Sequence, residues 1–202
     1  MDGKERKIIM GLDMYLERMP RYNGATAKDV RRVENYLDWI RAKFDGSEYA
    51  KCSFVEWCRC DDYPSHGEIE FYSDYYKATY SDWDVEKKHP WWRITEEVGY
   101  WRKANQIHNW FVENIQDGVD DCDFHREVTK EDLEELLDVC HEVLCNHDLA
   151  EARLPSTSGF FFGSTEYDEY YFDDIEKTID IITKVLETTD FETQMLYYCS
   201  SW

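Results

Sequence analysis

The stretch from Glu96 to Gln116 reads E-E-V-G-Y-W-R-K-A-N-Q-I-H-N-W-F-V-E-N-I-Q, and the interpretation of the chain starts from it. Apolar residues recur in it at steps of three and four, which is typical of an amphipathic helix. Thr95 can cap the start of such a helix and Asp117-Gly118 can end it. We therefore predict one helix over residues 95–116. It carries rings, cations and amides where an ordinary packing helix has Leu and Ala, namely Tyr100, Trp101, Arg102, Lys103, Asn105, His108 and Trp110.

A second unusual segment, Gly159 to Tyr171, reads G-F-F-F-G-S-T-E-Y-D-E-Y-Y. Three consecutive phenylalanines cannot all face water at low cost, so we expect this segment to insert into the core. We expect it to face helix 95–116 and to form a pocket with it. The tryptophans and Tyr100 would stack on a base, and Arg102 and Lys103 would hold phosphates. The polar residues of the second segment that would meet sugar hydroxyls or phosphate are Ser164, Thr165, Glu166 and Asp168.

The alternative interpretation of these residues is structural. Trp101, His108 and Phe111 would then belong to the core, and Arg102 and Lys103 would pair with nearby carboxylates. The structural role is the better interpretation for any single residue. For the cluster as a whole a binding site is favoured, because polar and aromatic groups alternate too densely for a helix that only packs.

The rest of the chain predicts an α+β fold in a single domain, 1–202. Alternation with a period of two predicts a strand at Met10–Met19, and Gln194–Trp202 also reads as a strand, so the two chain ends would pair in one small sheet. Three to four helices would pack on it. They are predicted at Ala27–Phe44, 95–116, from Thr129 through Leu144, and Asp168–Thr188, with a short helix around Phe54–Trp57. Residues 58–92 are interpreted as an irregular insertion with one short strand, Glu68–Tyr72.

The charge of the chain is strongly negative, −21 from 44 acidic and 23 basic residues. Nucleic-acid backbones need a basic footprint, so direct nucleic-acid binding is not expected. Two explanations of the acid excess stay open: a solvated surface, and imitation of a polyanion that occupies a basic cleft on another protein. No apolar run is long enough to span a membrane, and the start lacks a secretory signal, so we expect a cytoplasmic protein.

The seven cysteines are odd in number and do not suggest a disulfide framework, so free thiols are expected, with Cys140 in a helix core. Two weak metal-ligand sets are Cys52, Cys58, Cys60 and His66, and His141 and Cys145 with His147, Cys122 or His125. Neither has the paired spacing of a structural zinc site, so no metal and no cofactor are expected. The chain contains no G-x-S-x-G, Walker or H-E-x-x-H motif and we name no catalytic residue, which favours a binding protein over an enzyme.

Three motifs are similar to those of a family of uncharacterised proteins from bacteriophages and bacterial genomes. They are M-G-L-D-M-Y-L from Met10, V-G-Y-W-R-K-A-N-Q-I-H-N-W-F-V (98–112) and G-F-F-F-G-S-T-E-Y-D-E-Y-Y (159–171). The resemblance covers the first strand and most of the chain from Thr95 onward. It implies an origin in a phage or bacterial genome, and it assigns no catalytic residue.

The leading hypothesis from the sequence is a phage-type protein that binds a small, nucleotide-like molecule without transforming it. In a phage setting it would sequester a host immune signal in the host cytoplasm. The alternative is an acidic inhibitor that imitates nucleic acid and binds a basic host defence protein. The sequence leaves the oligomeric state open, a homo-oligomer included.

Overall fold

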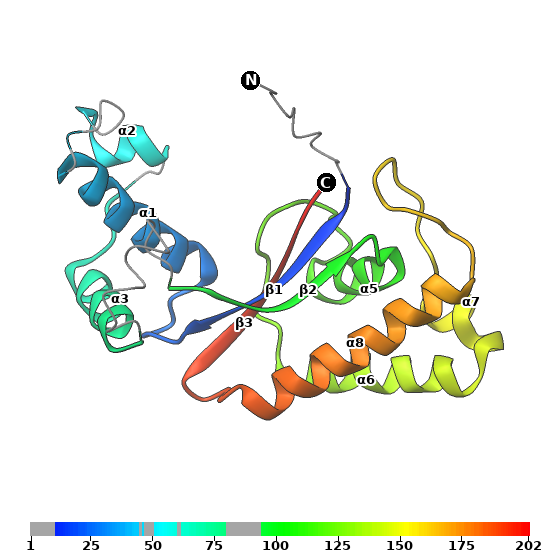
Figure 1. Cartoon of the computed structure of the whole chain (residues 1–202). Helices are drawn as coiled ribbons and strands as arrows, with labels where there is room; N and C mark the ends of the chain where they lie inside the picture. Colours follow the sequence, from blue (N-terminus) through cyan, green and yellow to red (C-terminus); the bar gives the residue numbers. More distant parts are fainter. Residues whose placement is uncertain (1–10, 45, 47–50, 60–61, 80–93) are drawn as a thin grey trace, which may run out of the picture. The chain divides into compact units, whose positions relative to one another are not determined.

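The computed structural model describes residues 11–44, 46, 51–59, 62–79 and 94–202. Three antiparallel strands form a sheet in the order β2-β1-β3: β1 is Asp13–Pro20, β2 is Glu96–Arg102 and β3 is Gln194–Ser201 (Figure 1). The amide of Lys103 donates to the carbonyl of Leu12 at 2.8 Å, which fixes the register of β2 on β1. The predicted α+β fold, with the two chain ends paired in one sheet, is confirmed.

The chain divides into two compact units, and all three strands contribute residues to both. Of the described residues, the first unit contains those within 11–17, 97–189 and 197–202, and the second contains those within 18–96 and 190–196. The predicted start of the first strand at Met10 and the predicted irregular segment over 80–92 fall outside the described residues.

Helices α5, α6, α7 and α8 belong to the first unit. They span Asn105–Ile115, Lys130–Cys145, Ala150–Arg153 and Glu169–Thr188, and a 3-10 turn, η2, covers His147–Leu149. The long helices α6 and α8 lie side by side (Figure 1). A capping box starts α6, because Thr129 and Asp132 satisfy each other's backbone amides. Cys140 is buried on α6, as predicted.

The second unit contains α1 (Ala27–Phe44), α2 (Phe54–Cys58) and α3 (His66–Thr79), and α1 contacts both of the others. A buried carboxylate organises this unit. One oxygen of Glu34 accepts the backbone amides of Ile94 and Thr95 at 2.6 and 3.0 Å, and the Thr95 hydroxyl at 3.1 Å. These bonds hold the chain entering β2 against α1.

The predicted helix over 95–116 is wrong in its first half. Residues 96–102 form β2, and the helix α5 begins only at Asn105. Pairing with β1 places these residues in the sheet, and Gly99 lets α8 approach closely, since a Cβ there would lie 2.9 Å from Cγ2 of Ile181. Aromatic and β-branched residues also suit a pleated surface. The backbone break falls at Lys103, which has a left-handed φ of 62°.

Two smaller predictions are also wrong. Glu68–Tyr72 lies inside α3 rather than in a strand, because Ser65 and Glu68 form a capping box that starts the helix. The three phenylalanines do not insert together: Phe162 is buried, but Phe160 is 95% exposed. A tight turn from Gly159 to Phe162 points the first ring outward.

None of the described helices has the length and apolar character needed to cross a membrane.

Candidate functional site

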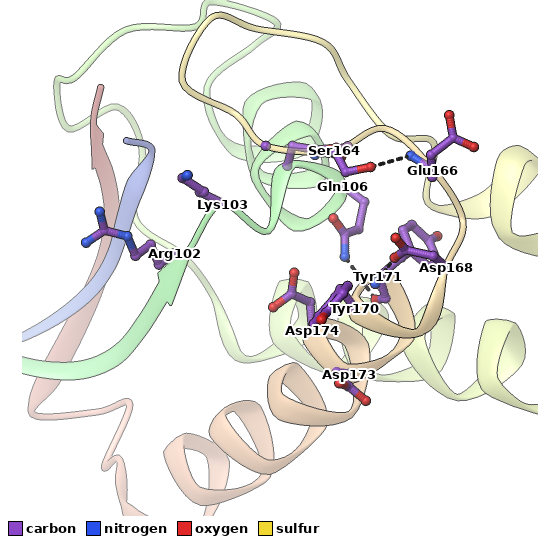
Figure 2. Close-up of a pocket in the computed structure, with 12 residues that line it drawn as sticks. Arg102, Lys103, Gln106, Ser164, Glu166, Asp168, Tyr170, Tyr171, Asp173 and Asp174 are labelled. Atoms are coloured by element: carbon purple, nitrogen blue, oxygen red, sulfur yellow. Dashed lines mark hydrogen bonds between the residues drawn. The ribbon is translucent and has the colours of Figure 1, made fainter. Parts of the chain in front are cut away.

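A pocket of about 390 Å³ lies in the first unit, where the end of β2, the loop before α8 and the first turns of α8 meet (Figure 2). Its lining residues are Arg102, Lys103, Asn105, Gln106, Gly163, Ser164, Glu166, Asp168, Tyr170, Tyr171, Asp173 and Asp174. The volume lies in the range of small-molecule sites, about 300–1,000 Å³. The segments around Lys103 and Ser164 that the sequence analysis paired therefore do surround one cavity.

Asn105 fastens the loop that forms one wall. Its side-chain amide donates to the carbonyls of Phe162 and Ser164 at 3.2 and 2.7 Å, and its oxygen accepts the amide of Thr157 at 3.0 Å. The residue is 2% exposed and all three groups it contacts are backbone. Its side chain therefore holds the loop in place, and the residue lines the cavity, where a ligand contact was predicted.

Lys103 occupies the joint between β2 and α5. Its left-handed backbone costs a non-glycine residue roughly 1–2 kcal/mol. Its stem passes Gly11 and Gly163, since a Cβ at either glycine would lie 3.2–3.3 Å from a Lys103 carbon. Its ammonium group forms no ion pair with any residue that the structure describes. A cation in this position is available to an anionic ligand.

Arg102 is the second cation of the pocket, and its guanidinium pairs with a carboxylate of the protein. It lies 3.5 Å from Asp13 Oδ1, and the Tyr100 hydroxyl donates to the same oxygen at 2.5 Å. The hydrogen bond to Asp13 raises the pKa of Tyr100. Tyr100 and Arg102 alternate with Trp101 on β2, so they share the strand face that meets Asp13.

The wall formed by α8 and the loop before it carries four carboxylates, from Glu166, Asp168, Asp173 and Asp174. Asp168 caps α8 by accepting the amide of Tyr171 at 3.2 Å. Figure 2 places Lys103 and Arg102 at the β2 end of the pocket and the acids around the start of α8. The pocket is therefore charge-separated, with two cations at one end and four carboxylates at the other.

Asp174 is the most perturbed carboxyl of this wall. Burial raises its pKa to about 6, although Lys177 and a hydrogen bond from Gln106 act in the opposite direction. Gln106 is 2% exposed and also donates to the carbonyl of Tyr171 at 3.2 Å. A partly desolvated carboxyl that lines a cleft is a candidate functional group.

The structure places several predicted site residues away from the pocket. Trp101 is fully buried and its indole donates to Thr178 at 2.9 Å, because strand geometry turns it toward α8. Trp110 is 6% exposed in the core. The predicted site residues that do not line the pocket are Tyr100, Trp101, His108, Trp110 and Thr165. For Trp101 and His108 the structural alternative is the one that matches their burial.

His108 lies in a buried hydrogen-bonded chain. In the tautomer that satisfies both contacts, Nε2 donates to Asp120 Oδ1 at 3.1 Å and Nδ1 accepts the Tyr198 hydroxyl at 2.7 Å. Burial lowers the pKa of His108, and Asp120 partly offsets this. The imidazole therefore links α5, β3 and the loop after α5.

Sequence reasoning missed the lining residues on α8, Tyr170, Asp173 and Asp174. A signal was present, because residues three and four apart share a helix face and α8 was predicted to start at Asp168. Tyr170 matters most among the rings, since it is 78% exposed and lines the cavity.

The described part of the chain contains no group of three or more His, Cys, Asp or Glu side chains placed to hold a metal ion. Cys60, from one proposed ligand set, lies outside the described residues. Cys52, Cys122, Cys140, Cys145 and Cys199 are not disulfide-bonded. Cys58 is disulfide-bonded, which corrects the expectation of a free thiol there.

No protein-family model, no curated protein and no solved structure matches this chain.

Proposed function

We propose that this protein binds a small, nucleotide-like molecule in the pocket between the β2–α5 joint and the start of α8. Lys103 carries the proposal. A glycine would relieve the left-handed backbone strain at this position, so a lysine there has a reason other than folding. Its ammonium group, which forms no ion pair with the carboxylates that the structure describes, is suited to a phosphate.

The other lining groups suit the remaining parts of such a ligand. Ser164 and Glu166 offer a hydroxyl and a carboxylate to sugar hydroxyls. The exposed ring of Tyr170 offers a face on which a base can stack. Tyr170, rather than Trp101 and Trp110, would therefore stack on the base.

Calorimetry with a panel of nucleotides tests the proposal. The motifs similar to phage proteins make nucleotide signals of host defence the first ligands to include, because sequestration of such a signal is the biological role we propose. A panel of mononucleotides, cyclic nucleotides and cyclic oligonucleotides that all fail to bind would refute it.

Lys103→Gly is the informative variant. Loss of a charge-assisted hydrogen bond, about 1.5–3 kcal/mol, weakens binding by at least about tenfold. Stability changes little, because relief of about 1–2 kcal/mol of strain offsets the extra chain freedom of glycine, about 0.5–1 kcal/mol. Lys130→Gln removes an equal charge from outside the pocket and serves as the control.

One observation favours the second candidate function, the acidic inhibitor of a basic protein. Residues 97–189 hold 23 acidic and 7 basic residues, so most of the net charge of −21 lies in this segment. This function predicts binding to a basic partner that weakens as salt rises. Changing exposed acids such as Glu131 and Glu134 to glutamine would weaken it, whereas Lys103→Gly would not.

A further inference from the structure

The end of the pocket opposite Lys103 offers hydrogen-bond acceptors in excess. Ionised carboxylates accept hydrogen bonds and cannot donate them. Asp168 already accepts one hydrogen bond, from the amide of Tyr171. Asp173 is exposed, and Glu166 lies on the loop before α8. A ligand group that enters this end therefore meets oxygen atoms that need donors.

Asp174 is the half-buried acceptor of this wall. Gln106, buried on α5, donates its side-chain amide to the carbonyl of Tyr171 at 3.2 Å. Figure 2 shows Asp174 and Gln106 together beside the cavity. The charged groups that act on Asp174 are Lys177, Asp173 and Asp168 of its own helix and cap, and the cations Lys103 and Arg102 line the same pocket from β2.

We infer that the acidic wall reads an amino group of the ligand, with Asp174 as the accepting carboxylate, so that amino nucleobases are bound in preference to oxo nucleobases. This inference rests on the proposed function, since it names the ligand class of the same pocket. An amino group donates to the carboxylate. A carbonyl in the same place sets acceptor against acceptor and leaves a partly desolvated charge without a partner.

The nucleotide pairs AMP with IMP, and CMP with UMP, test this directly. AMP and CMP present an amino group beside an accepting ring nitrogen, whereas IMP and UMP present a carbonyl beside a ring N–H. Both members of each pair carry the same phosphate for Lys103. Calorimetry at pH 7.5 should show the amino nucleotide binding about tenfold or more tightly than its oxo partner. The preference should shrink at pH 5.0, because the pKa of Asp174 is raised to about 6 and its carboxyl is then largely protonated.

Asp174→Asn should abolish the preference, because an asparagine amide both donates and accepts. Asp180→Asn makes the same charge change on an exposed part of α8 outside the pocket lining and should preserve the preference. Circular dichroism on both variants establishes that they fold.

The outcomes separate the two proposals. Equal binding of all four nucleotides, tighter binding of the oxo members, or a preference that survives Asp174→Asn would overturn the amino-group inference and leave nucleotide binding intact. Failure of these four nucleotides and of the wider panel to bind would overturn the proposed function itself.

Discussion

The side chain of Asn105 is expected to control the order of the loop that walls the pocket. Asn105→Ala removes three hydrogen bonds at once, to the carbonyls of Phe162 and Ser164 and from the amide of Thr157. Each such bond contributes about 1 kcal/mol net, so the loop loses about 3 kcal/mol of its attachment. That loss corresponds to about a hundredfold rise in the population of loop-open states.

Amide hydrogen exchange measures this loss at the place where it occurs. The Thr157 amide should exchange up to about a hundredfold faster in Asn105→Ala, and the free energy of unfolding should fall by at most about 3 kcal/mol. Asn109→Ala is the control, since Asn109 lies on the same helix and its side chain makes no hydrogen bond within the described part of the chain. Unchanged exchange at Thr157 in Asn105→Ala would show that the Asn105 side chain does not hold the loop.

A second variant tests the direction of the bonds. Asn105→Asp keeps the shape of the side chain and an acceptor for Thr157, but it places a carboxylate oxygen against the carbonyl of Ser164, where the amide donated at 2.7 Å. The loop should loosen at neutral pH and tighten again in acid, as the introduced carboxyl gains a proton that it can donate.

Three further predictions concern the rest of the chain. Glu34→Ala leaves the amides of Ile94 and Thr95 without their acceptor and should lower the free energy of unfolding in urea by about 3–5 kcal/mol, and a loss below about 1 kcal/mol would contradict the role described. Burial lowers the pKa of His108, so the neutral imidazole contributes fully to the free energy of unfolding above the unfolded pKa of about 6.5, and this contribution falls as the pH drops below that value. Thermal melts should therefore show that the difference in stability between the unmodified protein and His108→Gln narrows from pH 7.5 to 5.5. Phe160→Ser should change the free energy of unfolding by less than about 0.5 kcal/mol in the same urea titration, since the ring is 95% exposed.

Local signals in the sequence were sufficient for the long helices α6 and α8. The capping box at Thr129 and Asp132, the cap at Asp168 and the stripes of apolar residues behind them depend on groups within a few positions of each other. Such groups meet in almost any fold of the chain, which is why α6 and α8 begin where the sequence places them.

Residues 96–116 were different, because their pattern fits a period of 3.6 and a period of two over the first half. Trp101, which the leading interpretation placed in the pocket, is fully buried and lies outside the pocket lining. Whether the Arg102 side chain points into the pocket, and which aromatic residues line it, depends on whether the segment is a helix or a strand. Pairing with β1, through the bond from Lys103 to Leu12, and the close approach of Ile181 to Gly99 decide in favour of a strand.

The residue types alone indicated that the cations near residue 103 and the polar loop near residue 164 are candidates for one binding site. Packing between distant segments then fixed which side chains line the cavity: Asn105 hydrogen-bonds to the loop, the tryptophans lie in the core, and Asp174 and Tyr170 join the lining. These choices follow from contacts between segments more than fifty residues apart, and no local pattern encodes the geometry of such contacts.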